Sequence, residues 1–182
     1  GPPDVAQLEA IEAFFEERGA STFHEVSPLA DASLLPLLAD RGYRPIELTS
    51  ILYQPLAEHS LPTPAPDSSV LVRRVDAQNA EEPEQWARVA AEGWGETPEL
   101  AAFVREIGRV SARASGTHCF LAELEGRAIG AAALHIHEGV ALLAGASTIP
   151  AARRRGGQRA LLAARLRFAL AQGCDLAMMG AA

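Results

Sequence analysis

Residues 148–162 read Thr-Ile-Pro-Ala-Ala-Arg-Arg-Arg-Gly-Gly-Gln-Arg-Ala-Leu-Leu, and this segment is the most informative part of the chain. The residues before it predict a strand that ends at Pro150, and the Ala- and Leu-rich residues after it predict a helix. The first backbone N–H groups of a helix have no partners inside the helix, and Gly156 and Gly157 let an anion approach them closely. The helix dipole and three Arg residues add positive charge, so we predict a diphosphate-binding turn here.

Three consecutive Arg residues, Arg153 to Arg155, are more often a solvated surface than a binding site. Two features of their position argue against that interpretation. Positive charge at a helix N-terminus opposes the helix dipole, so the placement is unfavourable without an anion. The run also lies at a strand–helix junction, where open α/β sheets bind ligands. Because the chain has no Lys and no G-x-G-x-x-G pattern, the turn is neither a Lys-bearing phosphate loop nor a dinucleotide-binding turn.

The patterns on both sides of this segment predict an α/β domain with a mixed, mostly antiparallel sheet flanked by helices. Short turns at Glu125-Gly126 and Glu138-Gly139 join its central strands as hairpins. The expected order is strand 70–75, helices 83–93 and 97–114, strands 117–123, 128–137 and 140–149, helix 156–172 and strand 174–179.

The first 54 residues carry a separate pattern. It predicts a helix over 5–18, a strand over 22–26, a helix over 32–40 and one or two strands over 46–53. Four Pro residues between positions 55 and 66 then alternate with small and polar residues. Such a stretch can neither pair in a sheet nor continue a helix, so residues 55–69 are predicted to be an extended linker.

Composition excludes several classes of function. The net charge of -7 argues against general nucleic-acid or anionic-membrane binding, and no apolar run approaches the length of a membrane span. All 16 basic residues are Arg, which excludes a Schiff-base Lys and a pyridoxal-phosphate site. Cys119 and Cys174 are isolated and lie in apolar stretches. We expect them to be reduced, buried thiols in a cytoplasmic protein.

The turn resembles the acetyl-coenzyme A signature of the GNAT acetyltransferase superfamily, strand-x-Pro-x-x-Arg-x-x-Gly-x-(Gly/Ala)-helix. Pro150, Arg153 and Gly156 fall on this signature, while Gln158 stands where the family usually has Gly or Ala. The order of elements over residues 70–179 is similar to the family as well. The resemblance implies a GNAT-like sheet flanked by helices.

The resemblance also suggests how the chain is divided. Residues 1–54 look like the second half of a degenerate GNAT-like unit, and residues 70–182 look like an acetyl-CoA-binding GNAT domain. The family has a further helix and two strands after the last element, so this second unit is expected to be C-terminally incomplete.

The function implied by the resemblance is an acyl-CoA-dependent N-acetyltransferase. It would move an acetyl group from acetyl-CoA directly to a small-molecule or peptide amine, with no metal. A backbone N–H in the 146–148 region would receive the developing oxyanion. The residues that would contact the coenzyme are Ser147, Thr148, Ile149, Arg153, Arg154, Arg155, Gly156, Gly157, Gln158 and Arg159.

The general base is less apparent. Many family members place a Glu about 11 residues before the motif Arg, and that position here is Leu142. The hairpin places His135 opposite Leu142, and histidine is the side-chain type best suited to act as a base at neutral pH, so His135 is the catalytic candidate. Two His residues beside a hairpin, here His135 and His137, more often simply face solvent, and no third metal ligand is evident. Trp94 is expected to line the acceptor pocket or to anchor the core.

Two other functions remain open at this point. One is a catalytically silent GNAT module that binds CoA or a protein partner, and the other is an Arg-rich RNA-binding module. We also expect the first segment to extend the sheet of the second, within one chain or by exchange in a homodimer. In that arrangement Leu48, Ile51 and Leu52 would be buried.

Overall fold

The computed structural model describes residues 4–58, 61–62 and 69–181, and the chain divides into two compact units, Gly1–Leu48 and Thr49–Ala182. The predicted linker, residues 55–69, lies partly outside the described residues. None of the helices in the described ranges combines the length and the apolar character needed to span a membrane.

The first unit contains two helices, α1 (Val5–Glu16) and α2 (Leu34–Asp40). Asp4 caps α1 through its side chain, which accepts from the backbone N–H of Gln7 at 2.8 Å. The guanidinium of Arg41 pairs with Glu12 of α1. The prediction of a strand over 22–26 was wrong, since residues 21–27 form no strand. A strand needs a neighbour for its backbone groups, and no described residue pairs with this segment.

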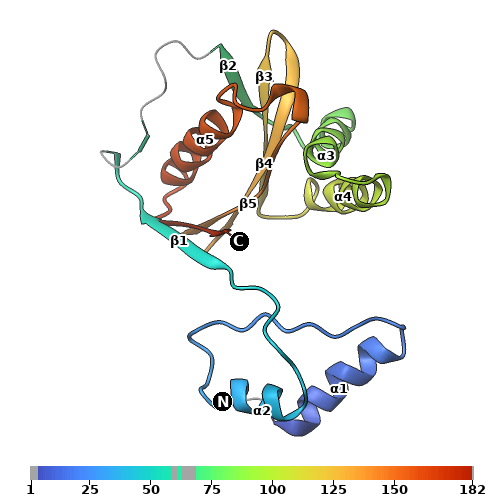
Figure 1. The fold of residues 1–182 in the computed structure, drawn as a ribbon. Coiled ribbons are helices and arrows are strands. Elements are labelled where there is room, and N and C mark those ends of the chain that lie inside the picture. The colour runs from blue at the N-terminus through green and yellow to red at the C-terminus, as the bar shows by residue number, and fades with distance from the viewer. Residues whose placement is uncertain (1–3, 59–60, 63–68, 182) are drawn as a thin grey trace. The chain divides into compact units, whose positions relative to one another are not determined.

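The second unit is built on one six-stranded sheet in the order β1-β6-β5-β4-β3-β2 (Figure 1). Neighbouring strands are antiparallel except β5 and β6, which are parallel. This is the mixed, mostly antiparallel sheet that the sequence predicts. Its strands are β1 (Ser50–Pro55), β2 (Val70–Arg74), β3 (Thr117–Leu124), β4 (Arg127–His137), β5 (Val140–Thr148) and β6 (Leu176–Ala181).

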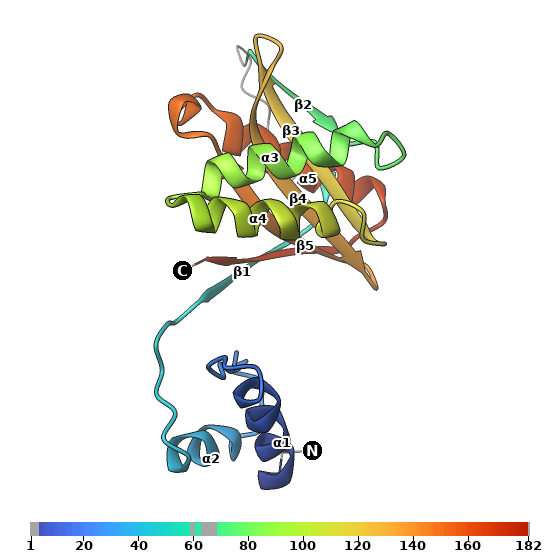
Figure 2. The same ribbon diagram turned by 90° about the vertical axis from the view of Figure 1, so that its right-hand side faces the viewer.

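Helices cover both faces of the sheet. Helix α5 (Gly157–Ala171) lies on one face, and α3 (Glu81–Trp94) and α4 (Pro98–Ser111) lie side by side on the other (Figures 1 and 2). The alternation of side chains along the strands divides the core accordingly. On the α5 side, Phe120 and Leu134 pack with Leu161, and on the α3 side, Leu121 packs with Trp86.

The contact between α3 and α4 combines a close approach with ion pairs. A Cβ added to Gly108 of α4 would lie 3.1 Å from the Cβ of Ala87 on α3. The carboxylate of Glu84 on α3 accepts hydrogen bonds from Arg109 and Arg105 of α4, which lower its pKa to about 2. The two helices are therefore fixed to one another as a pair.

Strand β5 is irregular at its carboxyl end. Ala133 of β4 faces Ala144, but Ala131 faces Ser147, so two residues of β5 lie opposite Ala132 alone. This is a β-bulge, and Gly145 adopts a φ of +57° within it. On its other side, β5 pairs with β6 only from Val140 to Leu142. The end of β5 is therefore paired on one side alone in the described structure.

The first segment contributes the edge strand of the sheet, as expected. Ser50–Pro55 runs antiparallel to β6, with Ser50 facing Ala181 and Pro55 facing Leu176. The expectation that Leu48, Ile51 and Leu52 are buried was wrong, since they are 88%, 50% and 47% exposed. Leu48 lies before β1, and among the described elements no helix packs closely over β1, so the side chains of Ile51 and Leu52 remain partly in solvent on its two faces.

Candidate functional site

A pocket of about 490 Å³ lies where α3, β5 and the turn into α5 meet. It collects the predicted turn, the end of β5 and the loop after α3. Its lining residues are Gly93, Trp94, Glu96, Ala146, Ser147, Thr148, Ala152, Arg153, Arg154, Gly156, Gly157, Gln158 and Arg159.

The wall formed by α5 is the N-terminus of that helix. Gly156 is the N-cap residue, with φ of 84° and no side-chain capping bond, so the first N–H groups of α5 have no side-chain acceptor at the cap. A Cβ added at Gly156 would meet no atom within 4 Å, so the space beside the cap is open. Unpartnered N–H groups facing a pocket form a ready site for an anion.

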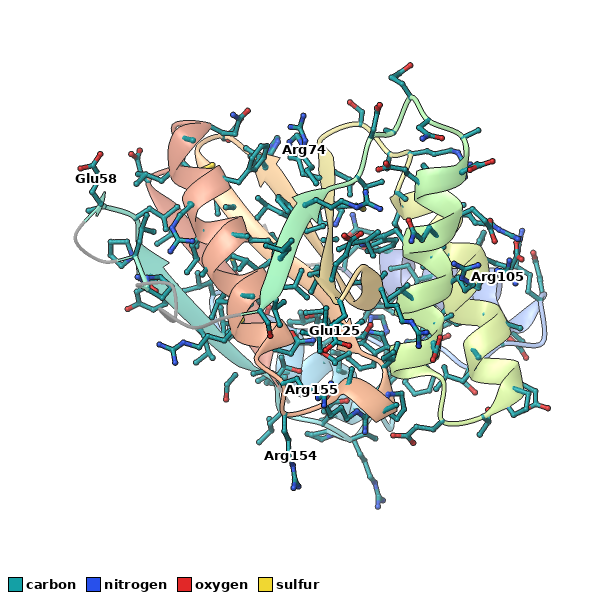
Figure 3. All side chains as sticks on the ribbon, turned by 90° about the horizontal axis from the view of Figure 1, so that it is seen from above. Glu58, Arg74, Arg105, Glu125, Arg154 and Arg155 are labelled. Carbon is teal, nitrogen blue, oxygen red and sulfur yellow. The ribbon has the colours of Figure 1, made fainter. Side chains whose placement is uncertain are left out.

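The three Arg residues of the turn differ in their surroundings. The guanidinium of Arg153 donates to the backbone carbonyls of Thr148 at 3.4 Å and Gly93 at 3.3 Å, so it links the turn to β5 and α3. Arg154 and Arg155 are exposed, and Figure 3 shows Arg154 extending away from the body of the domain. Arg153 therefore supports the pocket, while Arg154 remains available to a bound anion.

Gln158, which departs from the family signature, has a defined structural contact. Its side-chain amide donates to the hydroxyl of Thr148 at 2.8 Å. Thr148 is 9% exposed, so this bond ties the first turn of α5 to the buried end of β5. This bond involves the side chain of Gln158 and not its backbone N–H.

Close packing brings α3 against the end of β5. The hydroxyl of Ser147 donates to the carbonyl of Ala90 at 3.3 Å. A Cβ added to Gly93 would lie 2.5 Å from the Oγ of Ser147 and 3.0 Å from the backbone N of Thr148. Only Gly at position 93 allows this approach without a shift of the chain.

His135 lies opposite Leu142, which confirms the predicted register. Its Nδ1 is 2.9 Å from the hydroxyl of Thr117, and its side chain is half-buried. His135 does not line the pocket, and neither do Ile149 and Arg155. The structure therefore brings most of the predicted coenzyme residues together, with Trp94, but leaves His135 outside that group.

Two residues near the site were missed by the sequence analysis. Glu96 lines the pocket with Trp94, which is 51% exposed, and adds a carboxylate to a lining that contains Arg153, Arg154 and Arg159. Its place in the loop just after Trp94 was the available signal. Arg165 of α5 is only 3% exposed. Its spacing of four residues from Leu161 and from Ala169 places it on the buried face of the helix.

The family model described as "Acetyltransferase (GNAT) family" matches residues 77–181. No curated protein sequence matches the chain.

Solved structures resemble it at low sequence identity. The GCN5-related N-acetyltransferase from Kribbella flavida is 22% identical, with a TM-score of 0.75, covering 100% of this chain and 68% of that chain. A functionally unknown conserved protein from Staphylococcus epidermidis is 12% identical, with a TM-score of 0.60, covering 98% and 71%. PaiA N-acetyltransferase from Thermoplasma acidophilum in complex with coenzyme A is 18% identical, with a TM-score of 0.47, covering 58% and 74%.

The likeness to the Kribbella flavida structure shows that the fold is that of a GCN5-related N-acetyltransferase, as the sequence predicts. The family model covers the elements from α3 to β6 along the chain, including the whole turn into α5. Since this match spans more than half of the chain, the chain belongs to the GNAT acetyltransferase family.

Proposed function

We propose that this protein is an acyl-CoA-dependent N-acetyltransferase that moves an acetyl group from acetyl-CoA to an amine. The observation that supports this most is the N-terminus of α5, whose first N–H groups meet an open pocket without a side-chain cap. Arg154 and Arg159 line the same pocket and carry charge opposite to that of a diphosphate.

The pocket suggests how the coenzyme would lie. Its diphosphate would accept hydrogen bonds from the backbone at Gly156 to Arg159, where the helix dipole favours negative charge. Its pantetheine arm would then follow β5 back from Thr148 toward Leu142. Beyond Leu142, β5 has no strand beside it on the β6 side in the described structure, so its backbone groups on that side can bond the arm.

The reaction would be a direct transfer. A neutral amine attacks the thioester carbonyl, a C–N bond forms, and the C–S bond breaks as coenzyme A leaves as a thiolate. The oxyanion of the intermediate would be met by a backbone N–H in the 146–148 region, next to the bulge of β5. His135 is the proposed base for the ammonium proton, acting from the strand beside Leu142.

The acceptor is proposed to be a small-molecule or peptide amine. Trp94 and Glu96 stand on one wall of the pocket and offer an aromatic face and a carboxylate. Both attract an ammonium group before it loses its proton. The net charge of -7 favours a cationic acceptor over an anionic one.

Ligand-dependent stability tests the coenzyme part of this proposal. Coenzyme A at 100 times its Kd adds about 2.7 kcal/mol to the folded state, so thermal unfolding should shift to higher temperature. Release of free thiol from acetyl-CoA with a panel of amines then measures transfer. A well-folded protein that shows no shift at millimolar coenzyme A would overturn the proposal.

A catalytically silent GNAT module is the second candidate, because Leu142 occupies the position where many members have a Glu. The two candidates differ in one outcome. A silent module binds coenzyme A with the same stabilisation but releases no thiol above the uncatalysed rate with any amine.

A further inference from the structure

The buried polar side chains of the described residues gather at one place. They are Ser147, Thr148 and Arg165. Ser147 and Thr148 end β5 and line the pocket, and Arg165 reaches the same strand from α5 at Ala144. Arg is among the residue types that are least often fully buried, so the burial of Arg165 needs an explanation.

Arg165 is bound entirely to backbone carbonyls. Its Nε donates to Leu161 at 3.3 Å, and its Nη1 donates to Ala133 at 3.0 Å and to Ala144 at 3.4 Å. Within the described part of the chain, its hydrogen bonds come from Nε and Nη1, and no carboxylate forms an ion pair with it. Burial lowers its pKa to about 10, which still leaves the side chain charged at neutral pH.

The two strand carbonyls mark the edge of the bulge. Ala133 and Ala144 face each other and form the last regular pair of β4 and β5 before Gly145 and Ala146 break the register. Ala146 is the first residue of β5 that lines the pocket. Arg165 therefore bonds to both strands at the last regular residue pair before the bulge.

Nothing else in the described sheet holds β5 at this level from its other side. The pairing with β6 ends at Leu142, two residues before Ala144. A bulge locally disrupts the ladder and allows its backbone groups to change direction. Ser147, at the far end of the bulge, is held by its bond to Ala90 of α3. At the near end, the hydrogen bonds from Arg165 to Ala133 and Ala144 are the side-chain contacts that restrain it.

The choice of Arg is costly if the role is packing alone. Removing a guanidinium from water costs several kcal/mol, and an apolar residue of similar size would be at least as stabilising. A single guanidinium, however, can donate to two strands and to its own helix at once, since it carries five N–H groups in a fixed plane.

We propose that Arg165 is a positioning residue that fixes the bulge of β5 and thereby orients the backbone groups of Ala144 to Ser147 toward the pantetheine arm. This inference rests on the proposed function. Arg165 lies eight residues after Gly157 in α5, which is about 12 Å along the helix axis. It acts on the coenzyme at a different level from the diphosphate turn, and the two contributions can be measured separately.

The experiment compares two ligands. Coenzyme A carries the pantetheine arm, and adenosine 3′-phosphate 5′-diphosphate is the part of coenzyme A without it. Isothermal titration of the full chain gives the Kd of each for wild type and Arg165→Met. In Arg165→Met, coenzyme binding must itself order the bulge, and fixing the backbone of one residue costs about 1–2 kcal/mol, so coenzyme A should bind roughly 5- to 30-fold more weakly to the variant. The Kd of the nucleotide should differ between the variant and wild type by no more than about twofold, because this ligand lacks the pantetheine arm.

Arg167→Met is the matched control. Arg167 is on the same helix and also donates to a backbone carbonyl, that of Pro62 at 2.8 Å, but it does not line the pocket. It should leave both Kd values unchanged. Arg165→Lys keeps the charge with fewer donors, and it should recover part of the affinity for coenzyme A.

The outcomes separate the role of Arg165 from the proposed function. Unchanged affinity of Arg165→Met for coenzyme A, or an equal loss for both ligands, overturns the inference and leaves coenzyme binding established. If Arg165→Met does not fold, Arg165→Lys decides, since a loss confined to coenzyme A supports the inference and equal Kd ratios overturn it. Wild type that binds neither ligand overturns the proposed function and the inference with it.

Discussion

Gly156 shows how one residue can serve the turn in two ways. Its φ of 84° favours Gly, and its missing Cβ leaves space open beside the first N–H groups of α5. Asp at this position would place a carboxylate in the proposed diphosphate site. We expect Gly156→Asp to weaken coenzyme A binding at least roughly tenfold, about 1.4 kcal/mol, as measured by titration calorimetry.

Gly173 provides the control for this substitution. It follows the other end of α5 with a φ of 80°, and a Cβ there would also meet nothing within 4 Å. Gly173→Asp therefore introduces similar backbone strain and the same charge away from the pocket. If both variants lost affinity equally, strain in α5 rather than the anion site would be the cause.

His135 allows a direct test of the proposed base. Because it lies outside the pocket lining, His135→Ala should leave the Kd of coenzyme A unchanged. Loss of a general base should lower kcat by about 10²- to 10⁴-fold. His137, whose side chain is 88% exposed, is the control, and His137→Ala should keep full activity. If the His135→Ala enzyme is as fast as wild type, then water and not His135 removes the ammonium proton of the acceptor.

At the residue scale, the sequence predicts the anion-binding turn but not the contacts that hold it in place. Gly156, Gly157 and the Arg run are adjacent in the chain, so their chemistry could be seen from local spacing. The bond from Arg153 to the carbonyl of Gly93 joins residues 60 positions apart, and it exists only once α3 packs on β5. Arg165 was hidden for the same reason, since its acceptors belong to strands.

At the scale of elements, the crossing of α3 and β5 depends on the absence of a side chain. Gly93→Ala would push its Cβ against the Oγ and Cβ of Ser147. Overpacking of this kind costs about 1–3 kcal/mol, and the shift should also deform the pocket. Urea denaturation should show the loss of stability, and coenzyme A titration should show weaker binding.

A double variant identifies the cause. Ser147→Gly removes both side-chain atoms that the new Cβ would meet, so Gly93→Ala with Ser147→Gly should lose less stability than the two single losses added together. Strict additivity of the two losses would show that the contact between α3 and β5 is not the source of the effect.

The pairing of α3 with α4 should depend on pH through Glu84. Its pKa falls from 4.5 to about 2 in the folded protein, through hydrogen bonds from Arg109 and then Arg105. A depressed folded pKa contributes stability above the unfolded value, and this contribution is lost as the pH falls from about 4.5 toward 2.

Glu84→Gln should therefore unfold at lower urea concentration than wild type at pH 7, and the difference should shrink steadily below about pH 4.5. Glu92→Gln changes the charge of the same helix equally, and Glu92 has no ion pair among the described residues. A gap between wild type and Glu84→Gln that stays constant down to pH 2 would contradict the ion-pair explanation.

The sequence predicts the elements that have a strong apolar periodicity, but it is wrong for a segment that has no strand to pair with. The helices at α3, α4 and α5 and the hairpin strands follow from apolar spacing, capping at Thr97 and Gly-containing turns, and they lie within a few residues of their predicted bounds. The segment over 22–26 alternates like a strand but has no partner. Local pattern specifies a strand's faces, whereas the strand itself requires a neighbour.

At the scale of the whole molecule, β1 completes the sheet from outside the GNAT family match. It forms six register pairs with β6, whereas β5 forms only three with the same strand. Most of the backbone pairing of β6 therefore comes from residues 50–55. The sequence predicted that this segment would join the sheet, but the exposure of its apolar side chains depended on which parts of the sheet the helices cover.

Two shortened chains test this role. A chain of residues 49–182 keeps the second unit intact and should retain coenzyme A affinity. A chain of residues 57–182 lacks β1, and it should lose a few kcal/mol of unfolding free energy, since each ladder bond contributes about 0.5–1.5 kcal/mol. Equal stability of the two chains, by urea denaturation at low protein concentration, would show that β1 is dispensable.

The pairing of β1 with β6 also has a consequence for biosynthesis. Strands β2 to β5 and helices α3 to α5 all lie between the two partners in the sequence. At ~5–20 residues per second, β1 leaves the ribosome on the order of ten seconds before β6 exists. During that interval the apolar residues Ile51 to Tyr53 have no strand to pair with. The nascent chain therefore carries β1 unpaired while residues 56–175 are made, and a chaperone that covers this strand would keep it from pairing with other chains.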